Sequence, residues 1–288
     1  MDENVKERIL SGPHRKNQEL LLYIDALQLQ DTLSGPSLPS LGDFGAHLSE
    51  TERISRIQKF IDSFEYNYTG KPFVQYTKNG GFTNIVHSAK EFMRVALPIQ
   101  CVEAVFIGGY LSAGIQTVDR VPISFKTRMG DSIHRHIVLA MRYNNKWGSI
   151  GISRRPNLMN KELQFESLKE LLDDFRLSYH SCLHRVLTVY VGLPFPHDIY
   201  CTQGVKWRAL RIKMHPYDSD GMAAKLASYT DNMSGLFDYF LTYGHMPPEN
   251  MVPIKQVPQY QLPLGRRRQR SRSSSIGNES VMDRKVVK

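Results

Sequence analysis

The chain has 288 residues, of which 41% are hydrophobic and 10% aromatic, so most of it is expected to fold around a substantial core. Its formal net charge is +9, but the segment 266–288 holds eight basic and two acidic residues, which leaves +3 on the first 265 residues. This distribution excludes a nucleic-acid-binding charge spread over the whole body and places the excess on an appendage.

We expect residues 1–48 to form a leader. Within it, residues 17–33 carry leucine and isoleucine at helical spacing, which predicts one amphipathic helix, and the glycines and prolines of 35–45 predict a linker. The first residues lack the apolar run of a signal peptide, and no stretch is long and apolar enough to span a bilayer. We therefore expect a soluble, cytoplasmic protein whose three cysteines are reduced.

Three helices are predicted after the leader. The first opens with a capping box, Ser49 to Glu52, and places isoleucines and Phe64 on one side. The second runs from about residue 84 to 96 and stops before Pro98, because proline disfavours helical geometry in the residue before it. The third is apolar and begins near Cys101.

The hydrophobic period changes to two after residue 119, which indicates β-strands. Strands are predicted at 121–127, 134–143, 146–153, 187–191 and 207–214, with an amphipathic helix marked by Leu163 to Phe175 and a last helix at 221–243. The fold class is therefore α+β, with N-terminal helices packed on an antiparallel sheet in one domain spanning 49–246. Residues 247–288 are proline-rich and then rich in arginine and serine, so we expect disorder there.

A predicted hairpin brings two polar residues together. If Asn144 and Asn145 form a two-residue turn, the paired positions sum to 289 and His136 faces Ser153. Directly opposed residues share a face of the sheet, so an imidazole and a hydroxyl would lie side by side. Such a pair is catalytic or merely an idle polar contact, and the pairing alone does not decide between these.

Cys101 is the candidate nucleophile for this pair. It lies near a predicted helix N-terminus, where unpaired amides favour a thiolate and can stabilise an oxyanion. The alternative is that Cys101 is buried as a small apolar side chain.

Metal and cofactor motifs are weak. His180 and His184 are spaced for one helix face, but Cys182 points elsewhere and further zinc ligands are missing. Residues 218–221 begin like a calcium loop, but the glycine comes too early. We expect no metal and no cofactor.

Several short segments resemble the vasohibin family. They are Glu65 to Gly70, Leu97 to Ala104, Pro122 to Lys126, Arg135 to Leu139 and Ser153 to Arg155. Their spacing also matches, with 34 residues between Cys101 and His136 and 16 between His136 and Ser153. The resemblance implies a transglutaminase-like cysteine protease fold and a tubulin tyrosine carboxypeptidase, which removes the C-terminal tyrosine of α-tubulin.

By this resemblance, Cys101 is the nucleophile, His136 its general base and Ser153 the group that orients the imidazole. Tyr66 corresponds to the active-site tyrosine of the family, and Arg154 to the arginine that binds the substrate's terminal carboxylate.

Three more residues complete the predicted substrate site. Lys78 corresponds to a basic residue of the family's groove, and Arg155 is a weaker candidate because a neighbour in a strand points to the other face. The family carries a lysine immediately before the nucleophile, where this chain has Gln100. Because glutamine carries no charge, this difference weakens the expected binding of the substrate's terminal carboxylate.

The resemblance also implies partners. These are the glutamate-rich C-terminal tail of α-tubulin, microtubules, and the small vasohibin-binding protein, which packs against the N-terminal helices of the family. The helix at 17–33 could instead cover that surface of the N-terminal helices in cis. The basic tail is expected to favour encounters with microtubules; a localisation, nucleic-acid-binding or phosphorylatable segment is the alternative. We expect no membrane partner and no nucleic acid.

Two other functions stay open. One is a transglutaminase-like thiol peptidase or amidase that acts on another acidic C-terminus. The other is a non-enzymatic microtubule- or RNA-binding protein that keeps the fold, although the presence of cysteine, histidine and serine argues against it.

Overall fold

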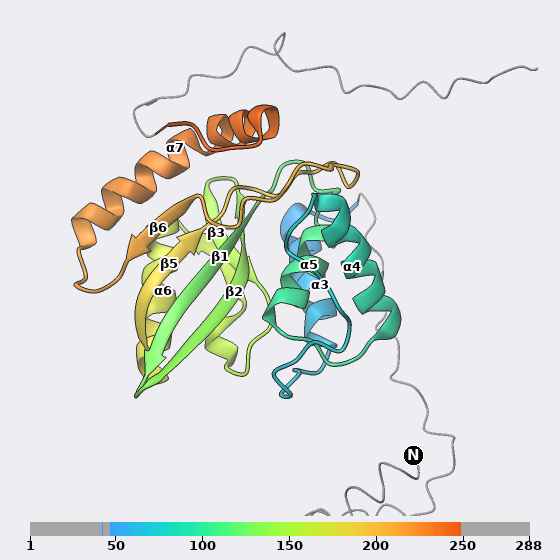
Figure 1. Ribbon diagram of the computed structural model, residues 1–288, viewed down its shortest axis with the longest axis horizontal. Helices are drawn as coiled ribbons and strands as arrows, with labels where there is room; N and C mark the ends of the chain where they lie inside the picture. Colours follow the sequence, from blue (N-terminus) through green and yellow to red (C-terminus); the bar gives the residue numbers. More distant parts are fainter. Residues whose placement is uncertain (1–41, 43–46, 249–288) are drawn as a thin grey trace, which may run out of the picture.

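The computed structural model describes Gly42 and residues 47–248, so the predicted leader helix, most of its linker and residues 249–288 lie outside the described part (Figure 1). The helices are α3 (Glu50–Asp62), α4 (Phe82–Val95), α5 (Cys101–Leu111), α6 (Leu168–Ser181) and α7 (Ser219–Tyr243), with a short 3-10 helix η1 (Pro156–Leu158). The strands are β1 (Asp119–Met129), β2 (Ser132–Tyr143), β3 (Lys146–Ile150), β4 (Lys161–Phe165), β5 (Arg185–Val191) and β6 (Leu210–Lys213).

The strands form one antiparallel sheet in the order β4-β3-β2-β1-β5-β6. Helices α3, α4 and α5 cover one face, and α6 covers the other, where buried residues of α7 join the same core (Figure 1). Alternate residues of β2 enter two cores: Ile137 and Leu139 pack on the α5 side, and Val138 and Ala140 on the α6 side. The predicted α+β class with an antiparallel sheet is confirmed.

The N-terminal helices follow the sequence prediction closely. The amide of Glu52 donates to Ser49 Oγ at 3.3 Å and the amide of Ser49 donates to Glu52 Oε2 at 2.9 Å, so the capping box is confirmed. Helix α4 ends at Val95 and is capped by Ala96, which has a left-handed φ of 54°, and α5 begins at Cys101 as predicted.

Helix α5 lies directly on the sheet because it carries glycine where it meets β3. A Cβ added to Gly108 would lie 2.8 Å from Cδ1 of Ile150, which is closer than real Cβ contacts. This close approach lets α5, whose first residue is Cys101, pack closely on β2 and β3.

The β2–β3 hairpin has the predicted turn and register. Asn144 and Asn145 have positive φ angles of 47° and 60°, and the pairs run from Tyr143 with Lys146 to Leu139 with Ile150. The strand ends there rather than at residue 153, because Gln58 of α3 binds both backbone groups of Gly151. Gln58 Nε2 donates to the Gly151 carbonyl, and the Gly151 amide donates to Gln58 Oε1, each at 2.9 Å.

The other elements differ from prediction mainly at their ends. The residue assigned to the start of the amphipathic helix, Leu163, belongs to the unpredicted strand β4, and α6 begins only after Ser167, whose hydroxyl accepts the amide of Glu170. Strand β5 starts two residues earlier than predicted, and β6 is shorter at both ends.

Candidate active site

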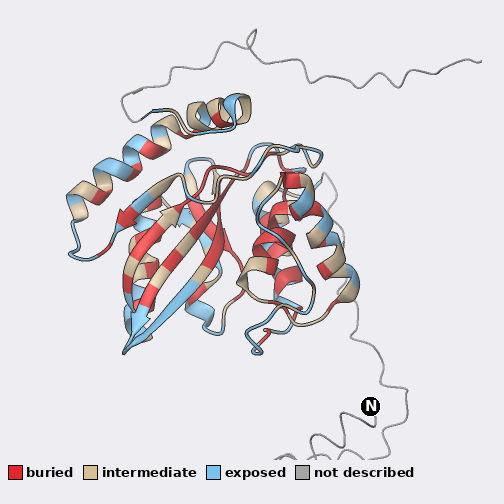
Figure 2. Cartoon of the chain, in the orientation of Figure 1, coloured by how far each residue is buried: buried red, intermediate tan, exposed pale blue. Residues whose placement is uncertain are grey.

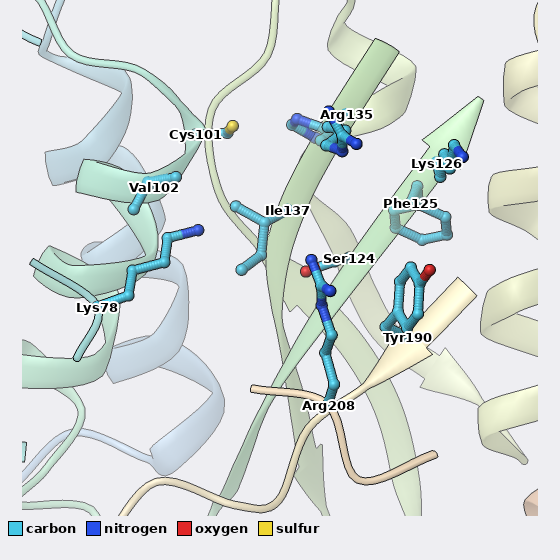
Figure 3. Close-up of a pocket in the computed structure, with 11 residues that line it drawn as sticks. Lys78, Cys101, Val102, Ser124, Phe125, Lys126, Arg135, Ile137, Tyr190 and Arg208 are labelled. Atoms are coloured by element: carbon cyan, nitrogen blue, oxygen red, sulfur yellow. The ribbon is translucent and has the colours of Figure 1, made fainter. Parts of the chain in front are cut away.

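Cys101 is the first residue of α5 and its thiol is half-buried. Its sulfur points toward β2 (Figure 3), where the backbone amides of Ile137 and of Cys101 itself are close enough to act on its pKa. Burial raises the pKa of the thiol, while these amides and the ammonium of Lys78 act in the opposite direction. Burial is the largest of these effects, so the resting thiol is protonated.

His136 lies on β2 opposite Phe125 and is half-buried. Its Nε2 atom is 2.7 Å from the carbonyl oxygen of Leu158, which belongs to η1. A carbonyl only accepts hydrogen bonds, so Nε2 carries the proton and Nδ1 of the neutral ring keeps a lone pair. Burial lowers the pKa of His136 to about 4, against a smaller opposing effect of the Leu158 contact.

The predicted strand pairing of His136 with Ser153 is wrong. Because Gln58 holds Gly151, the chain leaves the ladder after Ile150, and residues 151–155 form an irregular segment. The hydroxyl of Ser153 accepts the amide of Arg155 at 3.2 Å. The group that contacts the imidazole is instead the backbone carbonyl of Leu158.

Cys101 and His136 line the same pocket, whose volume is about 180 Å³. Its polar lining is cationic, because it includes two lysines and two arginines and none of its lining residues is acidic; the four cations are Lys78, Lys126, Arg135 and Arg208 (Figure 3). The guanidinium of Arg208 lies 4.6 Å from the ring centroid of Tyr190, which also lines the pocket. The pocket therefore combines a thiol, an imidazole and an environment suited to anionic ligands.

Arg154 and Tyr66 lie against each other outside the cationic pocket. The guanidinium carbon of Arg154 lies 5.5 Å from the ring centroid of Tyr66 and 5.7 Å from that of Tyr68. Tyr66 is bridged to Ile99, two residues before Cys101, by backbone pairing. The structure thus brings Arg154 and Tyr66 together beside the N-terminus of α5, although neither lines the cationic pocket.

The remaining predicted residues have distinct surroundings. Gln100 is the N-cap residue of α5, and its amide donates to Glu103 Oε2 at 3.3 Å. Lys78 lines the pocket and places its ammonium 5.3 Å from the Trp207 ring centroid. Arg155 is exposed, and its charge adds to burial and to the charge of His134 in lowering the pKa of His184, whereas Arg154 contacts Tyr66 and Tyr68.

Sequence reasoning missed several groups of the site. The carbonyl of Leu158 and the amide of Ile137 are backbone atoms, and no residue type marks them. Arg208 and Tyr190 reach the pocket from segments far along the chain. Lys126 and Arg135 could have been paired from the sequence, had the turn at Gly130 been recognised.

Within residues 47–248, no three His, Cys, Asp or Glu side chains gather closely enough to hold a metal ion. In the same part of the chain, no helix combines the length and apolar character that crossing a membrane requires.

Comparison with known proteins gives two matches. The sequence model of the vasohibin family matches residues 1–234, a range that includes every residue of the site described above. Tubulinyl-Tyr carboxypeptidase 1 of Mus musculus is 35% identical over 185 residues, which cover 64% of this chain and 49% of that protein. The chain therefore spans about half the length of this curated relative.

Proposed function

The chain belongs to the vasohibin family, and from this premise we propose that it is a cysteine carboxypeptidase that removes the C-terminal tyrosine of α-tubulin. The observation that carries the proposal is the cationic pocket that Cys101 and His136 line together. The name of the mouse relative, tubulinyl-Tyr carboxypeptidase 1, supports tyrosine as the residue released. A cysteine at the start of a helix, packed on an antiparallel sheet that supplies the histidine, supports a transglutaminase-like fold for the domain at 49–246.

The first step is proton transfer from the Cys101 thiol to Nδ1 of His136. The Leu158 carbonyl supports it by keeping the proton of the neutral ring on Nε2, which leaves Nδ1 as the base. The thiolate then attacks the carbonyl carbon of the last peptide bond and forms a tetrahedral adduct. The imidazolium returns its proton to the leaving amine, and the C–N bond breaks to release free tyrosine. Water, deprotonated by His136, hydrolyses the thioester and regenerates the thiol.

The N-terminus of α5 supplies the stabilisation of the oxyanion. The first amides of a helix have no partners within the helix, and they point outward at its positive end. The amide of Cys101 itself lies next to the sulfur, where the tetrahedral oxygen forms. The phenol of Tyr66, held near this end by its bridge to Ile99, is a second proposed donor.

The terminal carboxylate of the substrate is bound by Arg154. Its guanidinium lies against Tyr66 and Tyr68, outside the cationic pocket, and Tyr66 is bridged to Ile99, two residues before the nucleophile. A guanidinium can bind a carboxylate with two parallel hydrogen bonds, which suits recognition of a chain end. Gln100 adds no charge there, so Arg154 carries this recognition without the lysine that the family has at that position.

The positive charge of the pocket is complementary to the acidic tail of α-tubulin. Lys78, Lys126, Arg135 and Arg208 would attract the glutamates that precede the terminal tyrosine in the α-tubulin tail. We propose that the protein acts in the cytoplasm on microtubules, and that the small vasohibin-binding protein is a partner of its N-terminal helices.

Ser153 acts by holding the loop that carries Arg154, rather than by touching the imidazole.

Four peptides test the proposal. They share one glutamate-rich sequence and end in Tyr, Phe, Glu or amidated Tyr, and release of the last residue is measured by mass spectrometry. We expect release of Tyr and a loss of activity on the amidated peptide, because its carboxylate is missing. Equal release from all four would indicate a broader thiol peptidase or amidase, and no release from any peptide or from microtubules would indicate a non-enzymatic binding protein.

A further inference from the structure

The carbonyl of Leu158 accepts a hydrogen bond from Nε2 of His136, and two side chains outside the pocket hold the segment that carries this carbonyl. Leu158 is the last residue of η1, and its side chain is buried in the core on the α6 side of the sheet. Its amide donates to the carbonyl of Arg155 at 2.9 Å, which closes the single turn of η1. A single turn is not stable by itself, so the position of η1 depends on contacts with other elements.

The first contact comes from Ser149 of β3. Strand β3 belongs to the buried middle of the sheet, as Figure 2 shows, and Ser149 is only 1% exposed. Its hydroxyl donates to the carbonyl of Met159 at 2.8 Å. Because Met159 directly follows Leu158, this hydrogen bond fixes the C-terminal end of η1 against the sheet.

The second contact comes from Asn157, the middle residue of η1. Its Nδ2 atom donates to the hydroxyl of Ser181 at 3.2 Å and to the carbonyl of Ser178 at 3.4 Å. The carbonyl of Ser178 belongs to the last turn of α6, where carbonyls lack partners within the helix. The thiol of Cys182 is a weak donor and lies 3.7 Å from Asn157 Oδ1, so the tie between η1 and α6 rests on Nδ2.

The two contacts act on either side of one carbonyl. Asn157 precedes Leu158 and is held by α6, and Met159 follows Leu158 and is held by β3. Reactive groups keep their geometry only when surrounding hydrogen bonds hold them within about 0.5 Å, and the Leu158 carbonyl has such support from two elements.

We propose that Ser149 and Asn157 are positioning residues that hold the Leu158 carbonyl on Nε2 of His136. They thereby keep the imidazole in the tautomer and orientation that proton transfer from the thiol requires. The inference rests on the proposed function, which it deepens by naming the side chains that support the general base.

The test uses the full chain and the variants Ser149→Ala and Asn157→Ala. Each removes neutral hydrogen bonds behind the carbonyl, and kcat for a tail peptide ending in tyrosine should fall about fivefold in each and about 25-fold in the double variant. KM should stay unchanged, because the groups proposed to bind the substrate are not altered. This split separates a role in orienting the base from a role in binding.

Two matched controls remove the same kinds of hydrogen bond elsewhere. Ser112→Ala removes a buried hydroxyl that donates to the Gly108 carbonyl at 2.6 Å. Asn232→Ala removes a side-chain amide that donates to the Ser228 carbonyl at 2.7 Å on α7. Both should keep the wild-type kcat, whatever their effect on the free energy of unfolding.

An NMR measurement separates this proposal from the catalytic one. The chemical shifts of the two ring nitrogens of His136 report which of them carries the proton, and comparison with His136→Gln assigns the signals. We expect a protonated Nε2 and an unprotonated Nδ1 at neutral pH in the wild type and both controls, and a mixture of tautomers in the double variant. The measurement needs no substrate, so it tests the positioning role even if no form of the protein releases tyrosine.

Three results would overturn the proposal. The first is a wild-type kcat together with an unchanged ring spectrum in the double variant. The second is an equal fall in kcat in either control. The third is a rise in KM with kcat unchanged, because the two residues would then support the segment that carries Arg154 rather than the carbonyl of Leu158.

Discussion

The Nε2 atom of His136 lies 2.7 Å from the carbonyl oxygen of Leu158, and this contact defines the chemistry of the site. It fixes the proton of the neutral imidazole on Nε2 and leaves Nδ1 free to accept the proton of a thiol. A backbone carbonyl orients the ring without carrying a full negative charge, so it supports the imidazolium less than a carboxylate would. The site therefore rests as a neutral thiol and a neutral imidazole, in agreement with the raised pKa of Cys101 and the lowered pKa of His136.

Ser153→Ala should reduce activity only modestly. Its hydroxyl accepts one neutral hydrogen bond from the Arg155 amide, and the loss of such a bond, worth about 1 kcal/mol, corresponds to a change of about fivefold in kcat/KM. His136→Ala should cost about 10²- to 10⁴-fold, because it removes the general base. Release of tyrosine from a tail peptide measures both variants. A loss in Ser153→Ala as large as that in His136→Ala would assign the orienting role to the hydroxyl after all.

The reactivity of Cys101 should rise with pH over a high range. Burial raises the pKa of the thiol above its usual value of 9.0, so little thiolate exists near pH 7 in the free protein. The rate of alkylation by iodoacetamide, followed for the peptide that contains Cys101, should still be increasing at pH 9. A plateau reached below pH 7 would mean that thiolate and imidazolium form a stable ion pair at rest.

Gln100→Lys should lower KM for a peptide ending in tyrosine. The lysine adds a positive charge next to the nucleophile, and a charge-assisted hydrogen bond to the terminal carboxylate is worth about 1 kcal/mol more than a neutral one, or about fivefold in KM. The amidated peptide serves as the control, since it offers no carboxylate and its KM should not change. If KM for the free peptide is unchanged or rises, another residue already fills this role.

Gln58→Met should destabilise the protein and disturb the site. The variant leaves the buried amide and carbonyl of Gly151 without partners, at a cost of about 1–3 kcal/mol in the free energy of unfolding. Activity should fall as well, because Gly151 begins the segment that carries Arg154. Urea denaturation measures the change, with exposed Gln116→Met as the control, for which we expect less than about 0.5 kcal/mol. Equal stability of the two variants would contradict the role assigned to Gln58.

The sequence predicted most of what local patterns determine. The capping box at Ser49, the start of α5 at Cys101 and the turn at Asn144 each depend on residues a few positions apart, and all three are present. The family resemblance rests on short strings of the same kind, and the match to the vasohibin model bears it out.

What the sequence could not predict depends on contacts between distant segments. The end of β3 is set by Gln58, which lies 93 positions before Gly151, and nothing near residue 151 signals it. The partner of His136 is a backbone carbonyl, which every residue possesses. Arg208 joins the pocket only because the chain between β5 and β6 returns past Tyr190.

The central claim is that the thiol of Cys101 cleaves the terminal tyrosine from α-tubulin. Its most direct test compares the wild type with Cys101→Ala on polymerised microtubules, using a probe for detyrosinated α-tubulin, with Cys182→Ala as the control outside the pocket. We predict a detyrosination signal for the wild type and for Cys182→Ala, and none for Cys101→Ala. An equal signal from Cys101→Ala and the wild type would contradict the claim.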